Sequence, residues 1–169
     1  MRMTLLACTT LLLAACGQEE APKKAAAPAT LPAGEYEVTA TVTSLTSTDN
    51  TPVPTFTRQG ERTTTRGCVG ADGLPTAELL ATRGDSCQLQ NPYVRNGRMS
   101  FQLNCDRPGQ GNVMADVSGT FTADGFAGTL TAASMFAGSG DFQLVQEITA
   151  RKVADQCTAA TGGAGKAST

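Results

Sequence analysis

The sequence predicts an all-β domain, an antiparallel meander that forms a curved sheet or small barrel, with one short helix and two disulfides. Three observations lead to this prediction. Apolar and polar residues alternate with a period of two along most of the chain between positions 33 and 157. Glycines interrupt the strand patterns at Gly119 and Gly128, where bulges or sharp bends are expected. Four cysteines lie in this region, and an even set in an oxidising compartment predicts disulfides.

Residues 1–15 are typical of a lipoprotein signal peptide. Arg2 supplies a positive charge, and the apolar run after it is too short to span a bilayer. The letters LAAC end this run, so we expect cleavage before Cys16 and acylation of its thiol. More than one acyl chain would then hold the protein on the membrane. The residue after Cys16 is Gly17 and not aspartate, which favours sorting of the lipoprotein to the outer membrane. The alternative is an ordinary secretory signal cleaved near Thr10 or Ala14.

Three further regions follow from composition. Residues 16–32 hold the lipidated cysteine and a tether rich in Ala, Pro and charged residues, which is expected to be flexible. Residues 33–157 form the β domain, a size that suits one core. Residues 158–169 contain Thr, Ala, Gly, Ser and one lysine, and are expected to be disordered.

The elements of the β domain can be placed in order along the chain. Alternation predicts strands at 35–43, 113–122, 126–132 and 142–150. A threonine-rich segment at 56–68 is typical of a solvated or edge strand. Residues 75–82 are the helical candidate, because a proline begins the segment and Gly84 follows it.

A hairpin between positions 87 and 105 decides among the three possible disulfide pairings. We expect a three-residue loop centred on Asn96, with Gly97 in the left-handed region. That loop places Cys87 opposite Cys105 and Leu89 opposite Leu103, all on one face, and a slip of one residue would separate them. It also places Asn91 opposite Phe101 and Tyr93 opposite Met99, on the same apolar face. Cys68 and Cys157 then form the second disulfide by elimination.

Several of these segments together resemble a known family. Its features are GEYEV at 34–38, the four cysteines, the hairpin between two of them, DGFAGT at 124–129 and RKVADQC at 151–157. In order and spacing they are similar to domain of unknown function 3617, whose members are small exported Gram-negative proteins, often lipoproteins. The chain departs from the pattern at Tyr36 and Phe101, where tryptophan is common, and at Ala154. The resemblance implies a fold and an envelope location, but no activity.

Composition argues against several kinds of chemistry. The formal net charge of −2 gives no footprint for nucleic acid, so no nucleic-acid partner is expected. The chain has no histidine, the most frequent general base and metal ligand, and its paired cysteines could not ligate zinc. We therefore expect no metal and no cofactor. The Asp-Gly pairs at 72–73 and 124–125 and the loop 138–141 lack the alternating acidic ligands of a calcium site.

Two charged sets need an interpretation. Arg58, Arg62 and Arg66 are spaced for one face of a strand, where they could bind anionic lipid, although a solvated edge that resists aggregation is the more ordinary interpretation. The strand carboxylates occupy polar alternate positions, so they are expected to face solvent with ordinary pKa values. These are Glu35, Glu37, Asp116 and Glu147.

The sequence leaves two classes of function open. We expect a non-catalytic binding or assembly module, anchored to the membrane through its lipid and facing the periplasm. Its partner would be an apolar ligand or an envelope protein. The alternative is a hydrolase-type enzyme that uses carboxylate or Ser/Lys chemistry without histidine. A ligand would meet the apolar face of the sheet, which is expected to close mostly on itself and leave a small groove. The residues expected to face it are Tyr36, Val38, Phe101, Phe121, Leu130 and Leu144.

Overall fold

The computed structural model describes residues 27–54, 57–82 and 84–157. The expected signal peptide, Cys16, most of the expected tether and the C-terminal tail lie outside these residues. The described part of the chain contains no helix that is long and apolar enough to cross a membrane.

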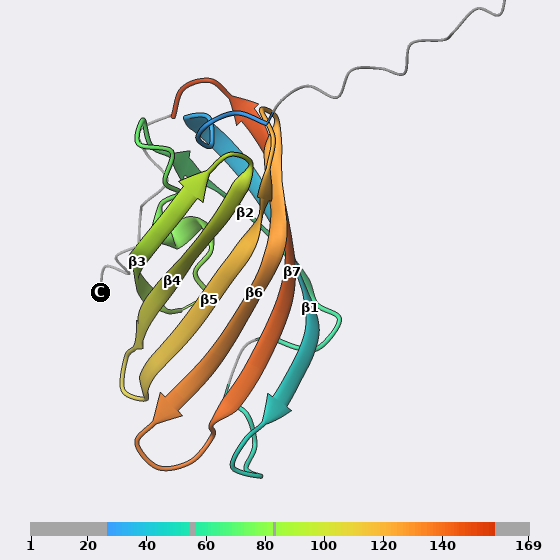
Figure 1. The fold of residues 1–169 in the computed structure, drawn as a ribbon. Coiled ribbons are helices and arrows are strands. Elements are labelled where there is room, and N and C mark those ends of the chain that lie inside the picture. The colour runs from blue at the N-terminus through green and yellow to red at the C-terminus, as the bar shows by residue number, and fades with distance from the viewer. Residues whose placement is uncertain (1–26, 55–56, 83, 158–169) are drawn as a thin grey trace, which may run out of the picture.

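The fold is a seven-stranded antiparallel sheet that curls into a half-barrel (Figure 1). The strands are β1 (Gly34–Ser47), β2 (Arg62–Val69), β3 (Ser86–Arg95), β4 (Arg98–Arg107), β5 (Gly111–Phe121), β6 (Gly125–Phe136) and β7 (Phe142–Ala154). Their order is β2-β1-β7-β6-β5-β4-β3, so β3 to β7 form a meander and β1 pairs with the last strand. The prediction of an all-β curved sheet is confirmed.

Strands β2 and β3 are the two edges of the half-barrel. The chain between them contains a short 3-10 helix, η1 (Ala77–Leu79), which contacts both edges. The helical prediction for residues 75–82 is therefore confirmed only as these three residues. The strand predicted at 56–68 also begins later, at Arg62, so Arg58 precedes the strand instead of sharing its face.

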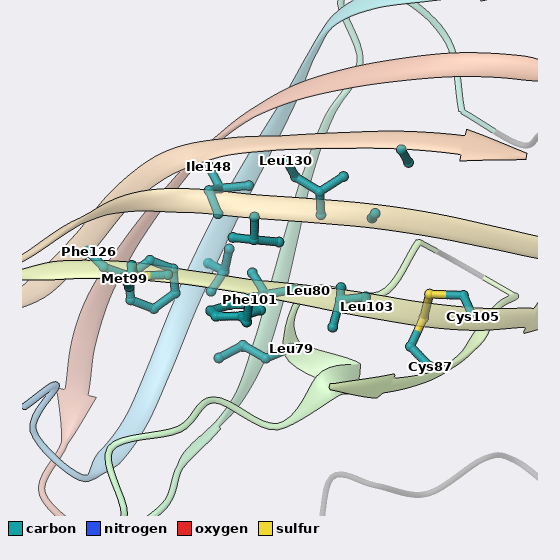
Figure 2. Close-up of a cluster of buried hydrophobic side chains, with 14 of the residues drawn as sticks. Leu79, Leu80, Cys87, Met99, Phe101, Leu103, Cys105, Phe126, Leu130 and Ile148 are labelled. Atoms are coloured by element: carbon teal, nitrogen blue, oxygen red, sulfur yellow. A yellow bond between two sulfur atoms is a disulfide. The ribbon is translucent and has the colours of Figure 1, made fainter. Parts of the chain in front are cut away.

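The core fills the concave side of the sheet, where the inward alternate positions of the strands meet. Figure 2 shows side chains of the sheet, including Phe101, Leu103 and Ile148, on the side of Leu79 and Leu80. Leu31, which precedes β1, is only 1% exposed and belongs to the same cluster. The packed chain thus begins a few residues earlier than position 33, inside the segment expected to be a tether.

The β3–β4 hairpin differs from the prediction in its loop and its register. Its turn has two residues, Asn96 and Gly97, and both have a positive φ, as this tight hairpin turn requires. A register shift between Gln90 and Tyr93 then supplies the extra residue, beside Asn91 at φ 50°.

The shift moves the last part of β3 to the opposite face. Tyr93 pairs with Ser100, not with Met99, and its side chain is 50% exposed. The predicted position of Tyr93 on the apolar face, and the pairing of Asn91 with Phe101, are therefore wrong. Cys87 and Cys105 still face each other, because they lie on the other side of the bulge.

Both predicted disulfides are present, Cys68–Cys157 and Cys87–Cys105. Each one ties an edge of the half-barrel to the rest of the fold. Cys68 belongs to β2 and Cys157 follows the last strand, whereas Cys87 lies on β3 and Cys105 on the neighbouring β4.

Gly119 and Gly128 are Cα partners in β5 and β6, and the ladder passes through them without a register shift. The expected bulge is therefore absent, and a close backbone approach takes its place. A Cβ on either residue would lie 2.8 Å from the Cα of the other, and closer still to carbonyl oxygens of the neighbouring strand. The glycines thus permit the sheet to curl tightly here.

Candidate ligand-binding cavity

A cavity of about 460 Å³ lies between the sheet and the segment that connects its two edges. The sheet contributes residues of β1, β2 and β7, and the connecting segment contributes η1 and the residues after it. The lining residues are Val38, Ala40, Thr57, Glu61, Thr63, Thr64, Thr65, Glu78, Leu79, Leu80, Ala81, Thr82, Gly84, Asp85, Gln146 and Ile148.

The floor of the cavity is apolar apart from one amide. Val38 and Ala40 of β1 lie beside Ala150 and Ile148 of β7 in the sheet, and Val38 and Ile148 are almost completely buried. This floor exists because alternate positions of both strands carry apolar side chains that point to the concave side.

Gln146 is the exception on the inward face of β7, between Leu144 and Ile148. Its residue is 6% exposed, and no hydrogen bond to its amide is found among the described residues. Every fully covered side-chain polar atom in the described part of the chain has a partner. The amide of Gln146 must therefore open on the cavity, where it can donate and accept hydrogen bonds.

Threonines of the edge strand form one wall. Thr65 is the Cα partner of Val38 and Thr63 is the partner of Ala40, so both threonine side chains lie on the concave face. They place hydroxyl groups beside the apolar floor. The wall is solvent-exposed, because no further strand pairs with β2 among the described residues.

The opposite wall rests on the sheet through leucines. Leu79 and Leu80 are 2% and 6% exposed, and a Cβ at Gly67 of β2 would meet the Leu79 side chain at 3.0 Å. The absence of a side chain at Gly67 thus lets Leu79 pack directly on the edge strand. The burial of both leucines anchors the connecting segment over the concave face.

An ion pair fixes the end of this segment. Arg107 donates from Nε to Asp85 Oδ1 at 2.6 Å and from Nη2 to Asp85 Oδ2 at 2.9 Å. The two side chains are 10% and 1% exposed. The guanidinium also donates to the carbonyl of Pro54, and it lies over the rings of Phe136 and Phe142 at 5.6 and 5.5 Å. The positive charge of Arg107 is therefore compensated by the carboxylate, the carbonyl oxygen and the two aromatic rings.

Most of the carboxylates that line the cavity already accept hydrogen bonds from other groups of the protein. Asp85 is held by Arg107, and Glu61 accepts the backbone N–H of Arg58 at 2.9 Å. Glu78 is exposed on the surface of η1. The lining therefore offers an apolar floor, hydroxyl groups and a free amide, which together can hold a small molecule that is partly apolar and partly polar.

A second carboxylate network closes the same end of the half-barrel as Arg107. Asp49, after β1, accepts two hydrogen bonds from Thr51 and one each from the backbone N–H groups of Gly140 and Asp141, before β7. These bonds hold the pKa of Asp49 well below its usual value. Asp49 thus holds the loop after β1 against the loop before β7.

The expectation of ordinary pKa values for the strand carboxylates is wrong for Glu37. Glu37 lies on β1, between Arg66 of β2 and Arg151 of β7. Each arginine donates two hydrogen bonds to its carboxylate, and these bonds lower the pKa of Glu37. The registers Glu37↔Arg66 and Glu37↔Arg151 bring the three together on the outer face. One of the three arginines considered for lipid binding is thus engaged in an ion pair.

The six residues expected to face a ligand are all buried on the concave side, but they do not all line the cavity. Val38 is part of the floor. Phe101, Phe121, Leu130 and Leu144 are 1–3% exposed within the packed core. The sheet does not close on itself, because its edges β2 and β3 are not paired with each other in the described part of the chain and the segment between them covers the concave side. Contact of these four residues with a ligand stays a prediction.

Tyr36 also lies in the core, against the ring of Phe126 at 5.9 Å, and its hydroxyl donates to the carbonyl of Pro32 at 2.7 Å. Burial, with a smaller contribution from Asp124, raises the pKa of Tyr36 to about 12. Sequence patterns did not identify Gln146, Arg107 or Asp85 as site residues. The signal available for Gln146 was a polar side chain at an apolar alternate position of the last strand.

The described residues contain no group of three or more His, Cys, Asp or Glu residues that could hold a metal ion. Comparisons with curated proteins and with solved structures found no match to the chain. A comparison with protein families did find one: the family described as "Protein of unknown function (DUF3617)" matches residues 31–157. This match begins at the buried Leu31, ends at the cysteine of the long-range disulfide and covers most of the chain. The chain belongs to this DUF3617 family.

Proposed function

We propose that this protein is a lipid-anchored, non-catalytic binding module of the bacterial envelope, and that its cavity holds a small amphipathic ligand. The observation that carries the proposal is the amide of Gln146, which opens on the cavity beside its apolar floor and has no hydrogen-bond partner among the described residues. A ligand that hydrogen-bonds this amide replaces water in the cavity, and the net contribution of such a bond is about 1 kcal/mol.

The size and lining of the cavity support this proposal. A volume of about 460 Å³ lies within the range of roughly 300–1,000 Å³ that is typical of small-molecule sites. The apolar floor suits a hydrocarbon portion, and Gln146 with the threonines of β2 suits a polar group. The anchor part of the proposal rests on the sequence LAAC that ends at Cys16, because a lipid on Cys16 would hold the cavity near a source of amphipathic molecules.

Binding can be tested with the apolar fluorophore N-phenyl-1-naphthylamine and with palmitate as competitor. Ala40→Phe should fill the cavity and abolish the fluorescence enhancement, because Ala40 lies on its floor. Thr39→Phe is the matched control, since Thr39 is the neighbouring residue on the opposite face of β1. Equal fluorescence from both variants would place the probe elsewhere and overturn the cavity as the site.

Gln146→Leu separates the polar from the apolar part of recognition. We expect fluorophore binding to persist and palmitate competition to weaken about fivefold, the equivalent of a net hydrogen bond of about 1 kcal/mol. If the protein hydrolyses a p-nitrophenyl acyl ester, and if Glu61→Gln or Glu78→Gln abolishes this activity, the protein is an enzyme and the proposal of a non-catalytic module is wrong.

A further inference from the structure

The start of the described chain is fixed at the end of the half-barrel that carries the β3–β4 turn (Figure 1). The backbone N–H of Asn96 donates to the carbonyl of Ala29 at 3.0 Å. A Cβ at Gly97 would meet the Cβ of Ala27 at 2.7 Å. The chain that comes from Cys16 therefore reaches the fold beside this turn.

The outer face of the same hairpin end carries two arginines and an aromatic ring. Tyr93 pairs with Ser100 and Arg95 pairs with Arg98, so these side chains share the face opposite to the buried Met99. Arg95 and Arg98 are exposed, and in the described part of the chain neither forms an ion pair. We call Tyr93, Arg95 and Arg98 the hairpin patch.

The length of the intervening chain keeps this patch near any anchor at Cys16. Cys16 precedes Ala27 by eleven positions, and an extended chain of that length spans at most roughly 40 Å. Strand β1, with 14 residues, is itself about 46 Å long. The end with the hairpin patch is thus the end of the domain that the anchor holds closest to the bilayer.

We propose that the hairpin patch rests on the anionic headgroups of the membrane that anchors the protein. This inference rests on the anchor in the proposed function, but not on ligand binding in the cavity. Arginine binds lipid phosphate through several parallel N–H donors, and tyrosine favours the membrane–water interface. Asp72 and Asp124 lie at the same end of the domain and carry negative charge, so the attraction to anionic headgroups is limited to the hairpin patch. Because the charges of the patch are exposed, this attraction should weaken as the salt concentration rises.

The chain is well suited to a test because it contains no tryptophan. Tyr93→Trp places a single reporter on the patch. Met135→Trp places one near the opposite end of β6, where Met135 is 58% exposed compared with 50% for Tyr93. Full-length lipidated protein is reconstituted in vesicles of phosphatidylglycerol and phosphatidylethanolamine with a headgroup spin label as quencher.

We expect strong quenching of Trp fluorescence in the Tyr93→Trp protein and little in the Met135→Trp protein. Adding Arg95→Ala and Arg98→Ala to the first variant should reduce quenching markedly, while Arg58→Ala with Arg62→Ala should not. The second pair is also exposed and without ion pairs in the described chain, but lies away from the hairpin. Each patch arginine should change the population of the bound orientation about fivefold.

Three results would overturn the proposal: equal quenching of the two reporters, stronger quenching of the Met135→Trp reporter, or no effect of the two patch arginines. Flotation of the vesicles gives a separate measurement of anchoring. Failure of the wild-type protein to float would refute the anchor itself, which distinguishes it from a failure of the hairpin patch.

Discussion

Asp85 and Arg107 form a two-point ion pair that joins the segment before β3 to the end of β4, and the guanidinium of Arg107 lies over the rings of Phe136 and Phe142. Asp85 also belongs to the lining of the cavity, so the ion pair holds one of the lining residues in place. Its two side chains are nearly buried, so the stability of the fold and the shape of the cavity depend on the same contact.

Arg107→Met should destabilise the fold by about 3–5 kcal/mol, because it leaves the buried carboxylate of Asp85 without its partner. The double variant Arg107→Met with Asp85→Leu should recover a large part of this loss, since no buried charge remains. Urea denaturation of the three proteins measures the difference. A double variant that is no more stable than Arg107→Met would contradict this explanation.

Asp49→Asn should lower the thermal midpoint at neutral pH, because an amide cannot accept all the hydrogen bonds that the carboxylate receives. The folded pKa of Asp49 lies below its usual value of 3.8, so its stabilisation is complete above that pH. It is lost as the pH falls through the folded pKa.

The midpoints of wild type and Asp49→Asn should therefore differ by a constant amount above about pH 4.5 and converge in stronger acid. Asp116→Asn is the control, because Asp116 accepts a single hydrogen bond, which comes from Gln102 and is exposed to solvent. A gap between wild type and Asp49→Asn that widens in acid would have the wrong sign and would refute this role of Asp49.

The two disulfides should contribute unequally. Cys68 and Cys157 are 89 residues apart, and Cys87 and Cys105 are 18 apart. In the chain-entropy account, the first contributes about 4.5 kcal/mol and the second about 3 kcal/mol. Replacement of each pair by alanine, followed by urea denaturation, should give the larger loss for Cys68 and Cys157. The opposite order would show that the chain-entropy account fails here.

Cys16→Ser should remove the protein from the membrane fraction, because the serine cannot take the thioether-linked lipid. Fractionation and mass spectrometry of the wild-type protein measure the acyl mass on Cys16. A mature protein with a free, unmodified thiol at Cys16 would exclude the lipoprotein interpretation.

The sequence contains the local part of this structure and little of the rest. Alternation places the strands, and the positions of Cys87 and Cys105 determine which residues of the hairpin oppose each other near the disulfide. The predicted position of Tyr93 is wrong because the hairpin has a two-residue turn and a bulge instead of a three-residue loop. The same sequence is compatible with both arrangements. Period-two patterns also identify Val38 as an inward residue, without revealing that it lies at a cavity.

The remaining features depend on contacts between distant segments. Asp85 and Arg107 are 22 residues apart, and Asp49 and Gly140 are 91 apart. Nothing in their local sequence indicates a partner. The pairing of β1 with β7 is likewise absent from any pattern, since alternation shows which face of a strand is buried but not which strand lies next to it.

The pairing of β1 with β7 also determines when the fold can be completed as the chain emerges during synthesis. Strands β3 to β7 pair with neighbours in sequence, so they can assemble as the chain emerges. β1 emerges before them, yet its partner β7 is the last strand to follow. The pairing of β1 with β7 must therefore wait until nearly the whole β domain has emerged. The first strand of the domain is thus the one that completes the sheet, because it joins the β3–β7 meander to the edge strand β2.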